Sequence, residues 1–215
     1  AATSGSGTVT NLLGETLSLG MDGGTLTING AKAQKTNVSA SNGVIHIFSA
    51  PIWRPSVFGI VRAIPQLDTL EAAIRAAGLQ DVLRQHESRY TLFAPTNRAF
   101  AQLLSELKLT ADQLLANKPL LTQVLTYHVL ASRVFSFQIK DDSTAATVQG
   151  QSIRFDTSGP RYFPSITLTD AQNRESKVIF PNLAARNGVV HLVDRVILPQ
   201  TSNIVELAVA NPQFS

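Results

Sequence analysis

The chain has 215 residues, 44% of them hydrophobic, and a formal net charge of +3 at neutral pH. This length suits one or two domains with a real core. No apolar run approaches the about 20 residues of a membrane-spanning helix, so we expect no transmembrane segment. The absence of cysteine excludes disulfides, thiolate metal sites and cysteine nucleophiles. Lysine and arginine are scattered without interleaved aromatic residues, so we expect no nucleic-acid partner.

The first part of the chain has the pattern of β-structure. Apolar and polar side chains alternate on both sides of Asp22-Gly23-Gly24, which predicts a β-hairpin over residues 17–28 with one buried face. The turn residues Asn42 and Gly43 precede a further predicted strand at residues 44–48.

The next part has helical periodicity. Apolar residues at helical spacing predict a helix over residues 70–77, with Asp68 or Thr69 as its cap and Gly78 at its end. A short strand is predicted at residues 90–94, before Pro95 stops it.

Three more helices are predicted further along the chain. Thr96 or Asn97 caps a helix whose apolar stripe lies within residues 100–107. A capping box that starts at Thr110 opens a short helix, and another helix covers residues 120–130.

From Val134 onward the apolar residues alternate as in strands. Helices therefore come first and strands second, which predicts an α+β fold.

The sequence also repeats itself over a long distance. Asn42-Gly43-Val44-Ile45-His46-Ile47 recurs as Asn187-Gly188-Val189-Val190-His191-Leu192, and Ala63-Ile64-Pro65-Gln66-Leu67 is similar to Ala210-Asn211-Pro212-Gln213-Phe214. A period of this length indicates tandem domains rather than a solenoid. We expect the C-terminal half of one domain, a complete domain, and then the opening helix of a further domain or a tail: residues 1–55, 56–199 and 200–215.

Three motifs in the predicted complete domain carry a family resemblance. They are Thr91-Leu92-Phe93-Ala94-Pro95-Thr96-Asn97-Arg98-Ala99-Phe100, Tyr127-His128-Val129-Leu130, and Asn187 to Asp194 followed by Val196-Ile197-Leu198-Pro199. In this order and spacing they resemble the fasciclin domain, an extracellular adhesion and interaction module. The resemblance implies a wedge of two β-sheets with helices packed on it, in one complete copy after a half copy.

The histidine of the second motif has two interpretations. Helical spacing places His128 on an apolar face together with Leu121, Val124 and Leu125, so we expect a buried histidine that is hydrogen-bonded to a backbone group or a side chain. The alternative comes from the resemblance, because a tyrosine-histidine pair has been linked to integrin-dependent adhesion in some fasciclin domains. That alternative makes Tyr127 and His128 interaction candidates.

A second adhesion motif of the family lies just before the Asn-Gly turn. The resemblance implies an aspartate followed by a branched aliphatic residue, and this chain has Asn182 and Leu183 there. Because integrin metal sites require a carboxylate ligand, the asparagine argues against that mode of binding. Asn182 and Leu183 nevertheless remain interaction candidates.

A loop that only the second copy contains supplies the remaining candidates. Turn residues surround Arg161, Tyr162 and Phe163, and exposed aromatic residues beside arginine are typical of binding hot spots. We expect this loop to be solvent-exposed and to form a contact surface; the alternative is a hairpin loop that is merely solvated.

Other motif residues have a structural interpretation. Thr96 and Asn97 stand at a helix start, and Asn187-Gly188 suits a turn with positive φ. His191 occupies the same place in the repeat as His46, which favours a role in folding.

No catalytic motif, metal site or cofactor site is predicted from the sequence. We expect a non-enzymatic, secreted or cell-envelope protein, of bacterial character in its plain composition, that works in adhesion. Its expected partners are proteins or glycans at the cell surface, neighbouring fasciclin domains, or a complementary fragment. The alternative function is binding of a lipophilic, carotenoid-type ligand, and a hydrolase ranks third.

Overall fold

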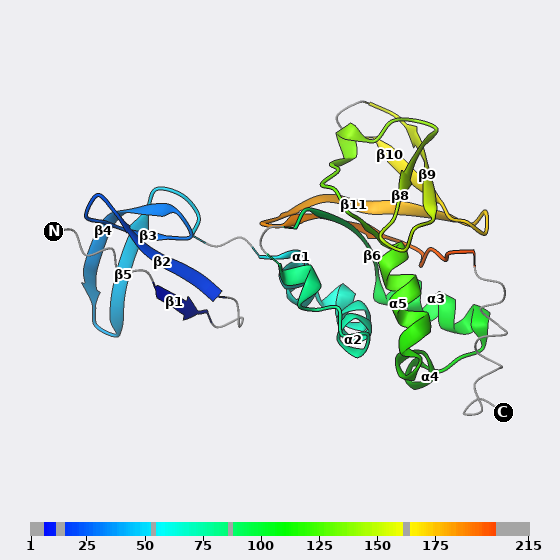
Figure 1. Ribbon diagram of the computed structural model, residues 1–215, viewed down its shortest axis with the longest axis horizontal. Helices are drawn as coiled ribbons and strands as arrows, with labels where there is room; N and C mark the ends of the chain where they lie inside the picture. The colour runs from blue at the N-terminus through cyan, green and yellow to red at the C-terminus, as the bar shows by residue number, and fades with distance from the viewer. Residues whose placement is uncertain (1–6, 12–15, 53–54, 86–87, 161–163, 201–215) are drawn as a thin grey trace. The chain divides into compact units, whose positions relative to one another are not determined.

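A computed structural model describes residues 7–11, 16–52, 55–85, 88–160 and 164–200. The chain divides into two compact units, Ala1–Pro55 and Ser56–Ser215. Each unit has its own β-sheet (Figure 1).

The first unit is an antiparallel sheet of five strands in sequence order. Its strands are β1 (Gly7–Thr10), β2 (Thr16–Asp22), β3 (Thr25–Ile28), β4 (Ala31–Ala40) and β5 (Gly43–Phe48). The predicted hairpin is confirmed, because Asp22 pairs with Thr25 and the turn between them uses the positive φ angles of Gly23 and Gly24. Its predicted buried face is not found, since Leu17 is buried but Leu19, Leu26 and Ile28 are only partly buried.

In the second unit the helices precede most of the strands, as predicted. The helices are α1 (Val57–Ala63), α2 (Asp68–Ala76), α3 (Asn97–Leu107), α4 (Ala111–Ala116) and α5 (Lys118–Tyr127), with short 3-10 turns η1 (Pro65–Leu67), η2 (Val82–Arg84) and η3 (Ser136–Gln138). The capping box at Thr110 is confirmed, and Thr96 rather than Asn97 caps α3.

Two details of these helices differ from prediction. Neither Asp68 nor Thr69 caps α2; instead the side chain of Asn97, at the start of α3, accepts a hydrogen bond from the Thr69 N–H at 2.9 Å. Helix α5 ends at Tyr127, because Val129 and Leu130 leave the helix to pair with β6.

Seven strands form the sheet of the second unit, in the order β7-β6-β12-β11-β10-β9-β8. They are β6 (Tyr90–Pro95), β7 (Val129–Leu130), β8 (Ser143–Ala146), β9 (Ser152–Ser158), β10 (Ser165–Thr169), β11 (Glu175–Ala185) and β12 (Gly188–Val193). The start of β11 pairs with β10, whereas its later part pairs with β12. This bends the sheet, so β8, β9 and β10 lie on the side opposite the helices (Figure 1).

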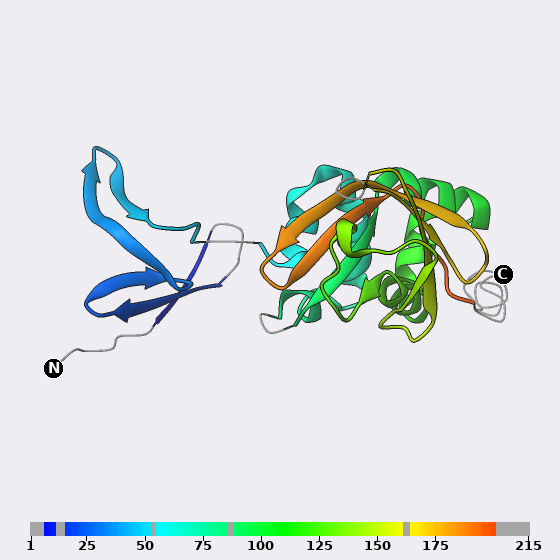
Figure 2. The ribbon, with the colours of Figure 1, turned by 90° about the horizontal axis from the view of Figure 1, so that it is seen from above.

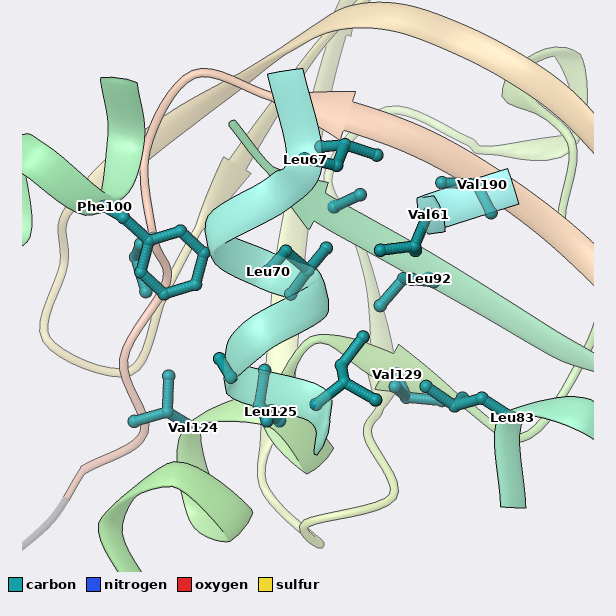
Figure 3. Close-up of a cluster of buried hydrophobic side chains, with 14 of the residues drawn as sticks. Val61, Leu67, Leu70, Leu83, Leu92, Phe100, Val124, Leu125, Val129 and Val190 are labelled. Carbon is teal, nitrogen blue, oxygen red and sulfur yellow. The ribbon is translucent and has the colours of Figure 1, made fainter. Parts of the chain in front are cut away.

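Two hydrophobic clusters fill this unit. The larger lies between the helices and the strands β6 and β12, and Figure 3 shows how Leu70 of α2 points toward Leu92 of β6 and Leu125 of α5. The smaller cluster includes Phe93, Tyr127 and residues of β9 and β10. Seen from above, the yellow strands lie in front of the green helices (Figure 2), so the central strands are covered on both faces.

The strands of the first unit repeat the geometry of the last strands of the second. Pairing between β4 and β5 shifts register on either side of Lys35, and pairing between β11 and β12 shifts on either side of Phe180, 145 positions later. Asn37 and Asn182 both have positive φ, and each backbone N–H donates to the Nδ1 of the histidine on the neighbouring strand, at 3.4 and 3.3 Å.

Candidate interaction site

Tyr127 lies at the end of α5 with its ring fully buried. Its hydroxyl donates a hydrogen bond to the Ser152 carbonyl at 2.9 Å and accepts one from the Ala171 N–H at 3.0 Å. Burial raises the pKa of this hydroxyl to about 12. The tyrosine therefore joins the helix to the start of β9 and to the turn after β10, and its hydroxyl already has two hydrogen-bond partners.

His128 follows directly and is also fully buried. Its Nδ1 lies 2.7 Å from the Val124 carbonyl, and its Nε2 accepts the Ile197 N–H at 3.1 Å. This places the proton on Nδ1 and confirms the expected backbone hydrogen bonding. Burial lowers the pKa of the imidazole to about 4, so the ring is neutral at neutral pH. A partner could reach Tyr127 or His128 only after local opening of the unit.

Asn187 holds together three separate parts of the second unit. Its side-chain oxygen accepts the Val57 N–H at 2.8 Å, and its side-chain nitrogen donates to the carbonyls of Leu83 and Gln85, both at 3.0 Å. Its backbone carbonyl accepts the Tyr90 N–H. All four partners belong to the helical half of the unit.

Gly188 permits a close approach of other elements. A Cβ at this position would lie 2.3 Å from the Tyr90 carbonyl oxygen and 2.8 Å from a methyl group of Val57. The expected positive φ of the Asn-Gly turn is wrong, since neither Asn187 nor Gly188 has one. The asparagine is required for its hydrogen bonds, and the glycine for its missing side chain.

The predicted adhesion motif at Asn182 is likewise part of the fold. In its left-handed backbone conformation, the side-chain oxygen accepts the Ser136 N–H at 2.8 Å and the side-chain nitrogen donates to the Ser136 hydroxyl at 2.7 Å. Leu183 next to it is only partly buried. The asparagine thus fastens η3 to β11, and Leu183 reaches the surface.

His191 links the same two regions from β12. Its Nδ1 accepts the Asn182 N–H, and its Nε2 lies 2.9 Å from the Val134 carbonyl. The ring stacks on Phe93 at 5.5 Å between centroids, and burial lowers its pKa. Because both nitrogens of His128 and of His191 contact backbone groups, neither imidazole is placed to act as a general base.

A groove of about 750 Å³ opens between the start of α3 and the exposed face of β11. Its apolar lining residues are Ile64, Ile179, Phe180, Leu183 and Leu192, and its polar lining residues are Gln66, Thr96, Asn97 and Arg98. Ile179 and Phe180 are 53% and 54% exposed. A concave site of this volume is in the range that binds small molecules or the anchor side chains of a protein.

A second recess of about 520 Å³ continues from the first. The two share Thr96, Arg98 and Ile179, but the second is lined mainly by charged residues. Its charged residues are Arg98, Glu175, Lys177, Asp194 and Arg195. An apolar lining beside charged residues is typical of a protein interface, which has an apolar centre and a polar rim.

Comparison with known proteins gives the family of the chain. The sequence profile of the fasciclin domain matches residues 1–53 and 65–199. The chain belongs to the fasciclin family. The transforming growth factor-beta-induced protein ig-h3 of Sus scrofa is 29% identical over 86% of the chain, and human periostin is 28% identical over 86% of it. The chain spans about a quarter of the length of the first relative and about a fifth of the second, 26% and 21%.

A bacterial relative is matched over nearly its whole length. Protein sll1735 of Synechocystis is 35% identical over 67% of the chain, and the match covers 98% of that protein. Among solved structures, a pair of FAS1 domains from the insect cell adhesion molecule fasciclin I has a TM-score of 0.60 at 14% identity, covering 95% of this chain and 68% of that one. This likeness shows the shared α+β fasciclin fold of sheets and helices.

The described site candidates do not share one surface. Tyr127 and His128 lie inside the core, Leu183 lines the groove, and Arg161, Tyr162 and Phe163 lie outside the described residues. Sequence reasoning missed the groove itself. The one available signal was the consecutive apolar pair Ile179-Phe180, which breaks the alternation of a half-buried strand.

The described part of the fasciclin chain has no group of three or more acidic or histidine side chains placed to hold a metal ion. Nor does any helix in that part have the length and hydropathy needed to cross a bilayer.

Proposed function

We propose that this chain is a non-enzymatic interaction module of a secreted or cell-envelope protein, and that the groove on β11 is its contact surface. Proteins with fasciclin domains are typically extracellular adhesion or interaction modules, and the family is generally non-enzymatic. The partner is a protein or glycan at the cell surface.

The observation that carries this proposal is the exposure of Ile179 and Phe180 in the lining of the groove. Two large apolar side chains in water forgo roughly 25 cal/mol for each Å² of apolar area that a partner could cover. An exposed apolar patch rimmed by polar groups is typical of interaction sites.

The fold itself does not require these side chains. The corresponding positions of β4 are Gln34 and Lys35, on a strand with the same register shift. Because polar residues occupy the same geometry in the first unit, the apolar pair is specific to the surface of the second.

We further propose that residues 1–55 are the C-terminal half of a fasciclin domain, 56–199 a complete domain, and 200–215 the opening helix of a further domain or a tail. The shared register shift and the matching contacts of Asn37 and Asn182 support the first assignment. Neighbouring fasciclin domains are then further partners.

Other candidates are secondary within this proposal. Tyr127 and His128 require local opening to act as an adhesion motif, since both are fully buried. The segment Arg161–Phe163 is proposed as an additional contact on the strength of its composition alone.

The double substitution Ile179→Gln and Phe180→Lys tests the groove, because it copies the residues of β4. We expect binding to an extracellular matrix or cell-surface preparation to fall by tenfold or more, since two apolar side chains of the groove lining are lost. Thermal unfolding should change little, because both side chains are exposed. Binding is measured by surface plasmon resonance with the full chain.

Phe137→Lys is the matched control, because Phe137 is 50% exposed but does not line either recess. Binding of this variant should equal that of the unmodified chain. The groove would not be the contact surface if the double variant bound as tightly as the unmodified chain, or if Phe137→Lys lost as much binding as the double variant.

A second candidate function is binding of a lipophilic, carotenoid-type ligand, which the apolar lining of the groove between helix and sheet favours. Protein purified from its native source would then retain visible absorbance, and the double variant would lose it. Colourless protein that still binds the cell surface favours the first function.

A further inference from the structure

Strand β5 is an edge of the first sheet, whereas its counterpart β12 is not. In the second unit, β12 pairs in parallel with β6, from Gly188 opposite Tyr90 to Val193 opposite Pro95. No described strand pairs with the corresponding side of β5. An unpaired edge presents backbone donors and acceptors to an incoming strand.

One face of β5 is uncovered as well. Ile45 and Ile47 are 53% and 45% exposed, while Val190 and Leu192, at the same positions of β12, are 0% and 5% exposed. Val190 and Leu192 belong to the cluster packed against the helices. The apolar face of β5 therefore has the composition of a helix-covered face without the helices.

Gly43 is the counterpart of Gly188, and nothing in the first unit explains it. Gly188 lacks a side chain because β6 and α1 lie within 2.8 Å of where its Cβ would be. Around Gly43, no heavy atom of the described residues lies within 4 Å of such a Cβ, and its φ is not positive. A glycine would be needed at position 43 only if another segment came as close to it as β6 and α1 come to Gly188.

Asn42 is the counterpart of Asn187. The Asn187 side chain makes three hydrogen bonds, all to backbone groups of the helical half. The side-chain amide of Asn42 is exposed and has no partner among the described residues. The first unit thus has the asparagine that would bind a helical half, but its described residues do not supply the backbone groups that this asparagine would bind.

We propose that β5, with Asn42, Gly43 and the face of Ile45 and Ile47, is an acceptor site for the helical half of a fasciclin domain, a segment built like residues 56–130. The segment adds a strand parallel to β5, as β6 adds to β12, and its helices cover the two isoleucines. Strand addition gives affinity through the backbone and selectivity through the side chains. This inference rests on the proposed half copy and names the partner that completes it.

A second copy joining edge to edge is the competing occupant. It would use the backbone of β5 but would leave Ile45 and Ile47 uncovered and the Asn42 amide unbonded. A segment built like residues 56–130 would pair with the edge of β5, cover its two isoleucines and hydrogen-bond the Asn42 amide. Residues 56–130 make the same three kinds of contact with β12 and Asn187 in the second unit.

Titration of the full chain with a polypeptide of residues 56–133 tests the proposal, because this probe carries the strand and helices that cover β12. We expect saturable binding with one probe for each chain. Asn42→Ala should weaken it tenfold or more, and Gly43→Ala should abolish it, since its Cβ would meet the incoming backbone. Gly7→Ala, on the far strand of the same sheet where a Cβ also meets nothing, is the matched control and should bind as the unmodified chain does.

Amide hydrogen exchange locates the bound probe. Slower exchange at residues 43–48 is expected, and no saturable binding, protection only in the second unit, or equal binding by Gly43→Ala would overturn the proposal. Self-association of the full chain that Gly43→Ala removes, without probe binding, would identify a second copy as the occupant and also overturn it. None of these substitutions changes a residue that lines the groove. A negative result here would therefore leave the proposed contact surface on β11 untouched, and the reverse also holds.

Discussion

Replacing Gly188 by alanine is expected to lower the free energy of unfolding of the second unit by at least about 3 kcal/mol, the upper part of the range for overpacking. The new Cβ would lie 2.3 Å from the Tyr90 carbonyl oxygen, which is backbone and cannot rotate away. The parallel pairing of β6 with β12 would have to separate. Urea unfolding followed by the helical circular dichroism signal measures the loss, since all described helices belong to this unit.

Gly43→Ala is the control at the same position of the first unit. Its Cβ meets no neighbour, so the helical unfolding curve should not move. An unchanged curve for Gly188→Ala would show that β6 and β12 are not as close as described here.

The stability of the second unit is expected to fall by about 3 kcal/mol between neutral pH and pH of about 4 through His128. The pKa of this imidazole is lowered from 6.5 to about 4, mainly by burial. Between these values the unfolded chain binds a proton that the folded chain does not. The contribution is therefore fully present above pH 6.5 and is lost as the pH falls toward about 4.

His128→Gln separates this contribution from the titration of carboxylates. We expect the variant to be roughly 1 to 3 kcal/mol less stable at neutral pH, through imperfect replacement of the bonds to Val124 and Ile197. Its stability should also depend less steeply on pH. His46→Gln, a histidine change in the first unit, should leave both quantities unchanged, and parallel pH profiles for the His128 variant and the unmodified chain would contradict the assignment.

Features that depend on neighbouring residues were predictable from the sequence. The capping box at Thr110, the hairpin around Gly23 and Gly24, and the order of helices before strands all follow from short-range patterns. The repeat alone identifies Asn42 and Asn187 as equivalent positions.

Features that depend on distant contacts were not predictable. The partners of Asn187 lie more than one hundred positions away in sequence, so the Asn-Gly pair was interpreted as a positive-φ turn. Val129 and Leu130 continue the apolar pattern of α5, but pairing with β6 removes them from the helix. The groove combines Ile64, the start of α3 and β11, segments that no sequence window contains.

The contact surface on β11 is tested most directly by photo-crosslinking. A photoreactive phenylalanine analogue at Phe180 points the reagent into the groove, and the same analogue at Lys35 occupies the equivalent position of β4. Cross-linked products with cell-surface material are identified by mass spectrometry. The proposed function predicts a defined protein or glycan adduct from position 180 and none from position 35. No adduct at position 180, or the same adducts from both positions, would contradict it.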